Sequence, residues 1–237
     1  MNLPDYDLSP IPIREDLADA HRKSWQQIGQ PGSSWSAAER IRFVNESRRA
    51  ASCQLCAARK TALSPVAIKG SHEHLGELPS AVVEVIHKMS TDPGRISRKW
   101  FDDVMSMGEL TAAQYVEIVG VVATSVAITT FHEALGLGEL KLPPPQAGDV
   151  SGILSDSVSD GEAWVPIMAE DNAEGTANII RALALVPGEQ ESFWRVKRAH
   201  YMNSIARAMD ETLDDALSRA QIEFIAARVS ALNQCFY

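Results

Sequence analysis

Apolar positions recur at the three- and four-residue spacing of amphipathic helices along most of the chain, beginning near Ser36. No stretch shows the two-residue alternation that indicates a half-buried strand. We predict helices, separated by turn residues, over Ser36–Lys60, Leu78–Met89, Ser97–Met107, Thr111–Leu135, Gly175–Leu185, Glu191–Asp210 and Leu217–Tyr237. The pattern therefore predicts an all-α fold.

Two segments lack this helical periodicity. Residues 1–34 contain four of the twelve prolines, and we expect them to form an N-terminal arm that wraps around the body or a partner. Residues 142–162 contain three consecutive prolines and a run of Ser, Asp and Gly, which is the composition of a linker. We therefore predict an arm (1–34), a first helical domain (35–141), a linker (142–162) and a second, C-terminally incomplete helical domain (163–237).

Three of the predicted helices begin with the same signature. Ser36, Thr111 and Ser218 each follow a large apolar residue and precede a Glu or Gln by three positions. This is a capping box, in which the hydroxyl accepts from a backbone N–H of the first turn and the Glu or Gln accepts from the cap's own N–H. Its recurrence on long apolar helices indicates a repeated helical unit and two related halves.

The chemistry of the first capped helix centres on Cys53 and Cys56. If residues 36–60 form one continuous helix, then Arg42, Glu46, Arg49, Cys53, Cys56 and Lys60 share one face, because successive members are three or four residues apart. Nearby cations lower the pKa of a thiol toward neutrality, which assigns that role to Arg49 and Lys60. After a peroxide oxidises one cysteine, the other can close a disulfide, with Glu46 exchanging the proton.

Other interpretations of the cysteine pair stay open. The pair also fits an unreactive structural feature on a solvated basic face. A zinc site needs four ligands, which Cys53, Cys56, His72 and His74 could supply. Ala57 stands where c-type haem attachment needs histidine, so that cofactor is excluded. We expect no organic or metal cofactor.

Composition and charge narrow the classes of partner and the cellular location expected for this protein. The chain has 22 Lys+Arg against 31 Asp+Glu, a formal charge of −9, which disfavours nucleic acid and anionic lipid as partners. The N-terminus lacks the pattern of a secretory signal, and the most apolar run, Ile118–Phe131, is shorter than a membrane span. Three cysteines are too few for a disulfide scaffold. We expect a cytoplasmic protein.

These helices resemble the peroxidase-related members of the alkylhydroperoxidase D / carboxymuconolactone decarboxylase-like superfamily. The resemblance is carried by Leu217–Tyr237 and by Glu46, Arg49, Cys53 and Cys56, and it extends over most of residues 36–237. It implies an all-α fold of repeated helical hairpins, a homo-oligomer, a hydroperoxide substrate and an external dithiol as reductant. It also implies that Cys56 is the peroxidatic cysteine and Cys53 the resolving one.

The first unit departs from the family pattern at two positions. Ile41 occupies the place of the relay glutamate, twelve residues before the first cysteine, so Glu46 would act in its stead. Lys60 replaces the histidine that the family has four residues after the second cysteine.

In the third unit Glu223 and Cys235 have the family spacing, which makes them further candidate site residues. The sequence stops at Tyr237, one residue before the second cysteine of the motif is due. We expect one of three explanations: a natural early stop, a shortened piece of a longer protein, or a UGA codon that encodes selenocysteine in the natural selenoprotein.

The sequence thus favours a thiol-dependent antioxidant peroxidase working through Cys53 and Cys56. One alternative is a non-enzymatic helical oligomer in which the cysteine pair is a redox sensor or a relic. Another is a cofactor-free decarboxylase or isomerase with a pocket near Glu117 and His132, as in other branches of the superfamily.

Overall fold

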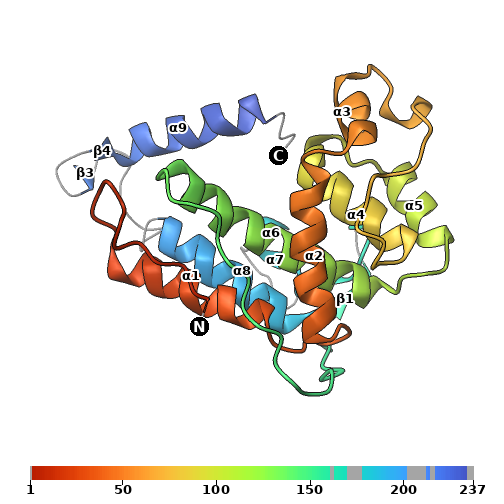
Figure 1. Ribbon diagram of the computed structural model, residues 1–237, viewed down its shortest axis with the longest axis horizontal. Helices are drawn as coiled ribbons and strands as arrows, with labels where there is room; N and C mark the ends of the chain where they lie inside the picture. Colours follow the sequence, from red (N-terminus) through yellow and green to blue (C-terminus); the bar gives the residue numbers. More distant parts are fainter. Residues whose placement is uncertain (1, 161–162, 170–177, 202–211, 214–216, 234–237) are drawn as a thin grey trace. The chain divides into compact units, whose positions relative to one another are not determined.

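The structure is a computed structural model that describes residues 2–160, 163–169, 178–201, 212–213 and 217–233 (Figure 1). Its helices are α1 (Glu15–Ile28), α2 (Ala37–Ala50), α3 (Gln54–Thr61), α4 (Ser80–Thr91), α5 (Arg98–Ser106), α6 (Ala112–Ala134), α7 (Asn178–Arg181), α8 (Pro187–His200) and α9 (Arg219–Leu232). The strands are two-residue antiparallel pairs, β1 (Val158–Ser159) with β2 (Ile167–Met168) and β3 (Thr212–Leu213) with β4 (Leu217–Ser218). The all-α character predicted from the sequence is confirmed for these residues.

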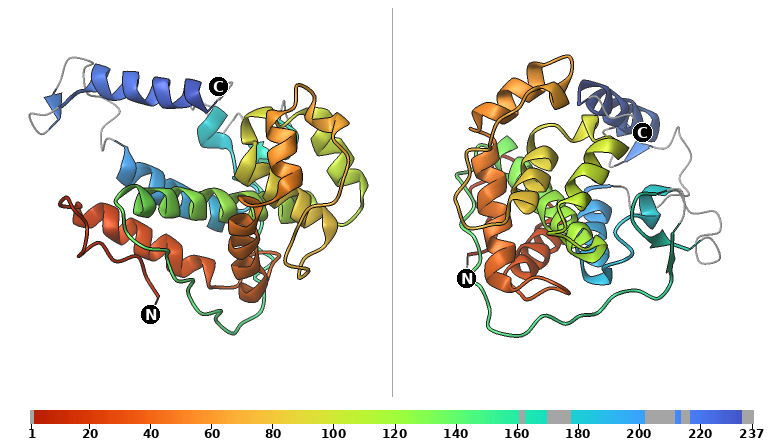
Figure 2. Two further views of the ribbon diagram at one scale, coloured as in Figure 1. Left: turned by 45° about the horizontal axis from the view of Figure 1, so that its top comes forward. Right: turned by 90° about the vertical axis from the view of Figure 1, so that its right-hand side faces the viewer.

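The chain divides into two compact units, Met1–His200 and Tyr201–Tyr237. In the first unit α6 packs against α2, α4 and α8, and α1 packs against α8 (Figures 1 and 2). We predicted a domain boundary at 142–162, but this extended segment lies inside the first unit. It leads back to α8, whose buried Val196 joins the same core as the helices before it. The structure therefore divides after His200 instead.

The central helix α6 is also the most apolar described helix. It is long and apolar enough to cross a membrane by length and composition, and 56% of the relevant window is buried inside the protein. Its neighbours cover Ile118, Val121 and Ile128 completely or nearly so. A single mostly buried helix of this kind is typical of the core of a soluble protein and is weak evidence for a membrane span.

The predicted N-terminal arm contains a helix that the sequence analysis missed. Helix α1 buries Leu17, His21, Ser24, Trp25 and Ile28. These residues have the spacing of one helix face, but two of them are polar, so the hydrophobic pattern is weak. Packing against α8 and α6 makes α1 part of the first unit rather than a wrapping arm.

All three predicted capping boxes are present. The hydroxyls of Ser36, Thr111 and Ser218 accept from the N–H three residues on, and the Glu or Gln side chain accepts from each cap's own N–H. The predicted helices at 78–89, 97–107 and 111–135 correspond to α4, α5 and α6 within about two residues, the usual uncertainty of helix ends. Parts of the later predicted helices, 202–211 and 234–237, lie outside the described residues.

The predicted continuous helix over 36–60 is wrong. Helix α2 ends at Ala50, and α3 begins at Gln54 after a bend (Figure 2). Ser52 contributes to this interruption, because its Oγ bonds back to the carbonyl of Arg49 at 3.1 Å. Cys53 has extended backbone angles and is the N-cap residue of α3. The single stripe of six aligned side chains is therefore not formed.

Candidate functional site

The break between α2 and α3 sets the position of both thiols. Cys53 caps α3, and Cys56 lies in its first turn, where backbone N–H groups and the helix dipole favour negative charge. The two residues are only 1% and 5% exposed. Burial alone would raise the pKa of the Cys53 thiol, but hydrogen bonds from the Cys56 and Glu73 backbone and from His72 lower this pKa to about 7.

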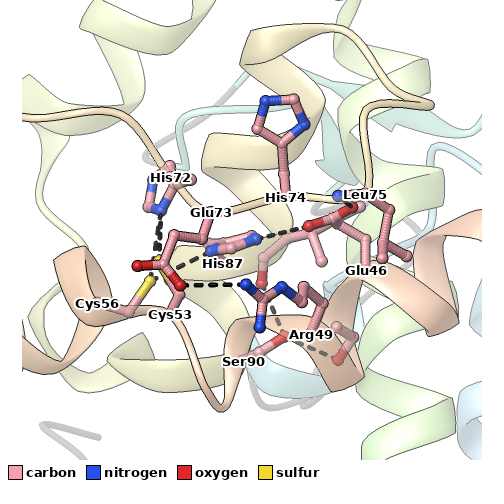
Figure 3. A network of polar contacts seen from close by, with 12 residues as sticks. Glu46, Arg49, Cys53, Cys56, His72, Glu73, His74, Leu75, His87 and Ser90 are labelled. Atoms are coloured by element: carbon pink, nitrogen blue, oxygen red, sulfur yellow. Dashed lines mark hydrogen bonds and ion pairs between the residues drawn. The ribbon is translucent and has the colours of Figure 1, made fainter.

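Two histidines from other elements face these sulfurs (Figure 3). His72 comes from the loop between α3 and α4, and its Nδ1 lies 3.6 Å from Cys53 Sγ and 3.4 Å from Cys56 Sγ. His87 comes from α4 and places Nδ1 3.3 Å from Cys56 Sγ. The ligand atoms of Cys53, Cys56, His72 and His87 all lie within 4.8 Å of one another.

A carboxylate holds each histidine from behind. His87 Nε2 lies 2.8 Å from Glu46 Oε1, and His72 Nε2 lies 2.8 Å from Glu84 Oε2. Because an ionised carboxylate only accepts hydrogen bonds, each Nε2 carries the proton it donates. A neutral ring then directs the lone pair of Nδ1 toward the sulfurs, whereas a cationic ring donates a proton from Nδ1 to them.

The carboxylates are themselves fixed. Glu46 is fully buried and accepts from the backbone N–H of Leu75 at 3.1 Å, which ties the His72 loop to α2. Glu84 accepts from Arg59 at 3.0 Å and from Trp100 Nε1 at 2.8 Å. The two rings are therefore oriented by a network that spans α2, α3, α4 and α5.

The two histidines differ in their electrostatics. Burial lowers the pKa of His72, but its hydrogen bonds to Cys56, Glu84 and Cys53 outweigh burial and raise this pKa to about 10. Burial raises the pKa of Glu84, and the bonds from His72, Trp100 and Arg59 reverse this to a pKa of about 2. For His87, burial dominates over Glu46 and lowers the pKa. His72 is thus the cationic partner and His87 the neutral one.

The remaining predicted members of the first site lie differently from the expected stripe. Glu46 is in the cluster but contacts His87 rather than a sulfur. Arg49 pairs with Glu73 at 3.1 Å (Figure 3), and its Nη1 donates to Ser52 Oγ. Lys60 is exposed near the end of α3, where its carbonyl accepts from Arg95 at 2.8 Å.

The predicted zinc ligand set is corrected in one member. His74 points away from the sulfurs (Figure 3), and its Nδ1 accepts from the N–H of Gly76 at 3.0 Å. His87 takes the fourth position. The signal for His87 in the sequence is indirect. His87 follows the buried residues Val83 and Ile86 on α4, so a polar side chain lies where the helix faces the core.

The other candidate residues lie outside this cluster. Glu223 accepts from the Tyr201 hydroxyl at 2.5 Å, and Arg219 lies 3.7 Å away. Cys235 lies outside the described residues. Glu117 is fully buried and accepts from Arg40, whereas His132 lies beside the ring of Tyr6, so the structure does not bring this second pair together.

A cavity of about 850 Å³ opens beside the cluster. His72, Glu84 and Arg59 form the wall that faces the thiols, and the cavity continues over apolar side chains of α4 and α5 such as Val83. A much smaller space that reaches Cys56 shares Arg59, His72 and Lys88 with this cavity. These three residues therefore border both the cavity and the space next to the thiol.

Comparison with models of known protein families, with curated proteins and with solved structures finds no match to this chain. Its function must be argued from the site itself.

Proposed function

We propose that this protein reduces organic hydroperoxides through a dithiol–disulfide cycle of Cys53 and Cys56. The observation that carries the proposal is the chain Cys56 Sγ–His87–Glu46, with separations of 3.3 and 2.8 Å, next to a second thiol one helix turn away. Nucleophilic thiols in enzymes are activated by an adjacent base that a third group orients. Here α3, α4 and α2 each supply one member of that arrangement.

We assign the proton transfers along this chain of contacts. Cys56 gives its proton to Nδ1 of His87, and the resulting imidazolium is stabilised by Glu46. The thiolate attacks the terminal oxygen of the hydroperoxide, the O–O bond breaks, and the alkoxide leaves with the proton from His87. Cys56 becomes a sulfenic acid and the product is an alcohol.

Cys53 completes the cycle. Its thiol attacks the sulfenic sulfur of Cys56, which releases water and forms a disulfide. An external dithiol then returns the pair to the reduced state. The two electrons delivered to each hydroperoxide are thereby replaced.

The adjacent cavity favours an organic substrate. Its walls include Val66, Leu78 and Trp100, which suit an apolar body, whereas Lys69 and Lys99 suit an anionic or strongly polar end. We propose that such a hydroperoxide enters between His72 and Arg59, because these residues line both the cavity and the small space that reaches Cys56.

The resemblance to alkylhydroperoxidase D-like proteins supports this proposal and extends it. His87 and Glu46 would serve as the proton relay in place of the family histidine, whose position holds Lys60. Repeated helical hairpins in two related halves, a homo-oligomer and a cytoplasmic location remain part of the proposal.

The test is a reaction of the fully reduced, metal-free protein with one equivalent of tert-butyl hydroperoxide. We expect intact mass to fall by about 2 Da, peptide mapping to join Cys53 to Cys56, and a dithiol to reverse the change. Cys53→Ser should stop at the sulfenic acid, and Cys56→Ser should abolish turnover. If both thiols stay free after prolonged incubation with the hydroperoxide, the proposal is refuted.

The relay needs its own control. His87→Asn should slow oxidation of Cys56 about 100-fold or more, whereas Glu77→Gln should leave the rate unchanged, because Glu77 is half exposed and pairs with Arg42. Helical content by circular dichroism shows whether the His87 variant is folded. A folded His87→Asn protein with the original rate would remove His87 from the mechanism.

A further inference from the structure

We infer that Cys53, Cys56, His72 and His87 bind one Zn²⁺ ion in the reduced protein. The inference does not require peroxidase activity, since it concerns the same side chains acting as ligands. A C-x-x-C pair at the start of a helix combined with two histidines supplies the sulfur and nitrogen donors that structural zinc sites use.

The distances fit a tetrahedral centre. With Zn–S of about 2.3 Å and Zn–N of about 2.0–2.1 Å, tetrahedral angles separate sulfur from nitrogen by about 3.5 Å. His72 Nδ1 lies 3.6 and 3.4 Å from the sulfurs of Cys53 and Cys56, and His87 Nδ1 lies 3.3 Å from the sulfur of Cys56. The two donor atoms that are farthest apart lie within 4.8 Å of each other, so they need to approach by only about 1 Å to bind the same ion.

The rings are oriented as metal-bound histidines are. Metal-ligating histidines almost always donate their second ring N–H to a carboxylate, a carbonyl or water, which fixes the tautomer. His87 does so to Glu46 and His72 does so to Glu84, each at 2.8 Å, and both leave Nδ1 facing the sulfurs. Both histidines have the same ligating atom and the same kind of carboxylate partner.

Charge and burial agree with this assignment. Two thiolates neutralise Zn²⁺, and zinc displaces the Nδ1 proton that His72 carries in the metal-free protein. Arg59 balances part of the charge of Glu84 beyond the ligands. Cys53, Cys56 and His87 are at most 5% exposed, and the side chain of His72 is 8% exposed. Four protein donors leave no open position for water. The site is therefore suited to hold zinc rather than to use it as a catalyst.

Zinc and hydroperoxide compete for the same sulfurs, and this consequence rests on the proposed function. When a hydroperoxide oxidises the two thiolates, they lose two electrons and form the disulfide. The hydroperoxide takes up these electrons and two protons to give an alcohol and water, and Zn²⁺ is released because a disulfide cannot serve as two thiolate ligands. Bound zinc would thus protect Cys53 and Cys56 from oxidation until the ion is released.

The test titrates the reduced full chain with Zn²⁺ in competition with a chromophoric chelator, without oxidant. We expect one equivalent to bind, and Co²⁺ in its place to give the visible absorption of a tetrahedral thiolate complex. Cys56→Ser and His87→Ala should weaken binding more than about 100-fold, and Glu84→Gln should weaken it about 10- to 100-fold.

His74→Ala is the matched control and should bind zinc within twofold of the unaltered chain, because His74 is the nearby histidine that points elsewhere. Absence of a bound equivalent at micromolar zinc, or equal losses for His74→Ala and His87→Ala in folded proteins, would overturn the inference. The two proposals separate cleanly: zinc binding without hydroperoxide turnover removes only the proposed function, and turnover without zinc binding removes only the metal site.

Discussion

Arg40 shows how a single residue connects three helices. It is 2% exposed on α2, and its Nη1 donates to Glu117 Oε1 of α6 at 2.7 Å and to Glu189 Oε1 of α8 at 2.6 Å. Burial raises the pKa of Glu189, Arg40 lowers it, and the charge of Glu117 adds to the rise. One guanidinium thus compensates two buried carboxylates.

Removal of this arginine should be costly. Arg40→Met should lower the free energy of unfolding by about 3–5 kcal/mol, because it leaves two carboxylates buried without a cation. Urea unfolding followed by circular dichroism measures the change. Glu189→Gln is the comparison and should cost much less, since it removes the repulsion with Glu117 and keeps the Arg40–Glu117 pair. Equal losses for the two variants would contradict this account.

At the same scale, the candidate site was only half predictable. Cys53 and Cys56 are recognisable from their spacing. Glu46 was expected from a continuous helix that does not form, and His72 from the alternative zinc site. His87 lies 31 residues beyond Cys56, so only the packing of α4 against α2 brings it to the thiols. The pairing of each histidine with a carboxylate is equally a product of that packing.

Among the elements, the capped helix starts were predictable because a capping box is a local device. The hydroxyl, the Glu or Gln and the N–H groups they satisfy lie within four consecutive residues. The break after Ala50 was not predictable, because residues 50–53 contain neither Gly nor Pro to mark the end of a helix. Cys53 has local contacts with Ala50 and Cys56, but its contacts with His72 and Glu73 come from a distant loop.

The cap of α6 can be tested directly. Thr111→Ala should lower the free energy of unfolding by about 1 kcal/mol, because the N–H of Gln114 loses its acceptor. Thr130→Ala is the matched control on the same helix; its side chain is exposed and the change should be neutral within about 0.5 kcal/mol. Chemical denaturation of both variants provides the measurement. Equal effects at the two positions would mean that the cap contributes nothing.

For the whole molecule, the helical class followed from the sequence but the grouping of helices did not. Composition predicts a linker at 142–162, yet α1, which precedes this segment, and α8, which follows it, pack against each other. Helix α1 escaped prediction because its buried face includes His21 and Ser24. The same two polar residues that weaken the hydrophobic pattern also form hydrogen bonds to α8.

His21 lies at this junction. The Tyr6 hydroxyl forms a hydrogen bond with Nδ1 of His21, and Nε2 of His21 lies 2.7 Å from Nε2 of His200 on α8. Burial lowers the pKa of His21 to about 3, and the repulsion that its protonated ring would meet from protonated His200 and His132 contributes to this shift. Burial and the nearby charge of Arg14 also lower the pKa of His200. Both rings are therefore neutral in the folded protein.

This arrangement predicts that the first unit loses stability in mild acid. Above pH 6.5 His21 is neutral in both the folded and unfolded states and has no effect. Below pH 6.5 His21 is protonated in the unfolded chain, whereas in the folded chain it stays neutral down to about pH 3. The free energy of unfolding therefore falls as pH falls, by up to about 1.4 kcal/mol per pH unit for each such histidine. His21→Gln should reduce that slope between pH 6.5 and 5, whereas His74→Gln, a change in a loop histidine, should not. Urea titrations at several pH values measure both slopes; an unchanged slope in a folded His21→Gln protein would show that His21 is not the residue that makes the junction sensitive to acid.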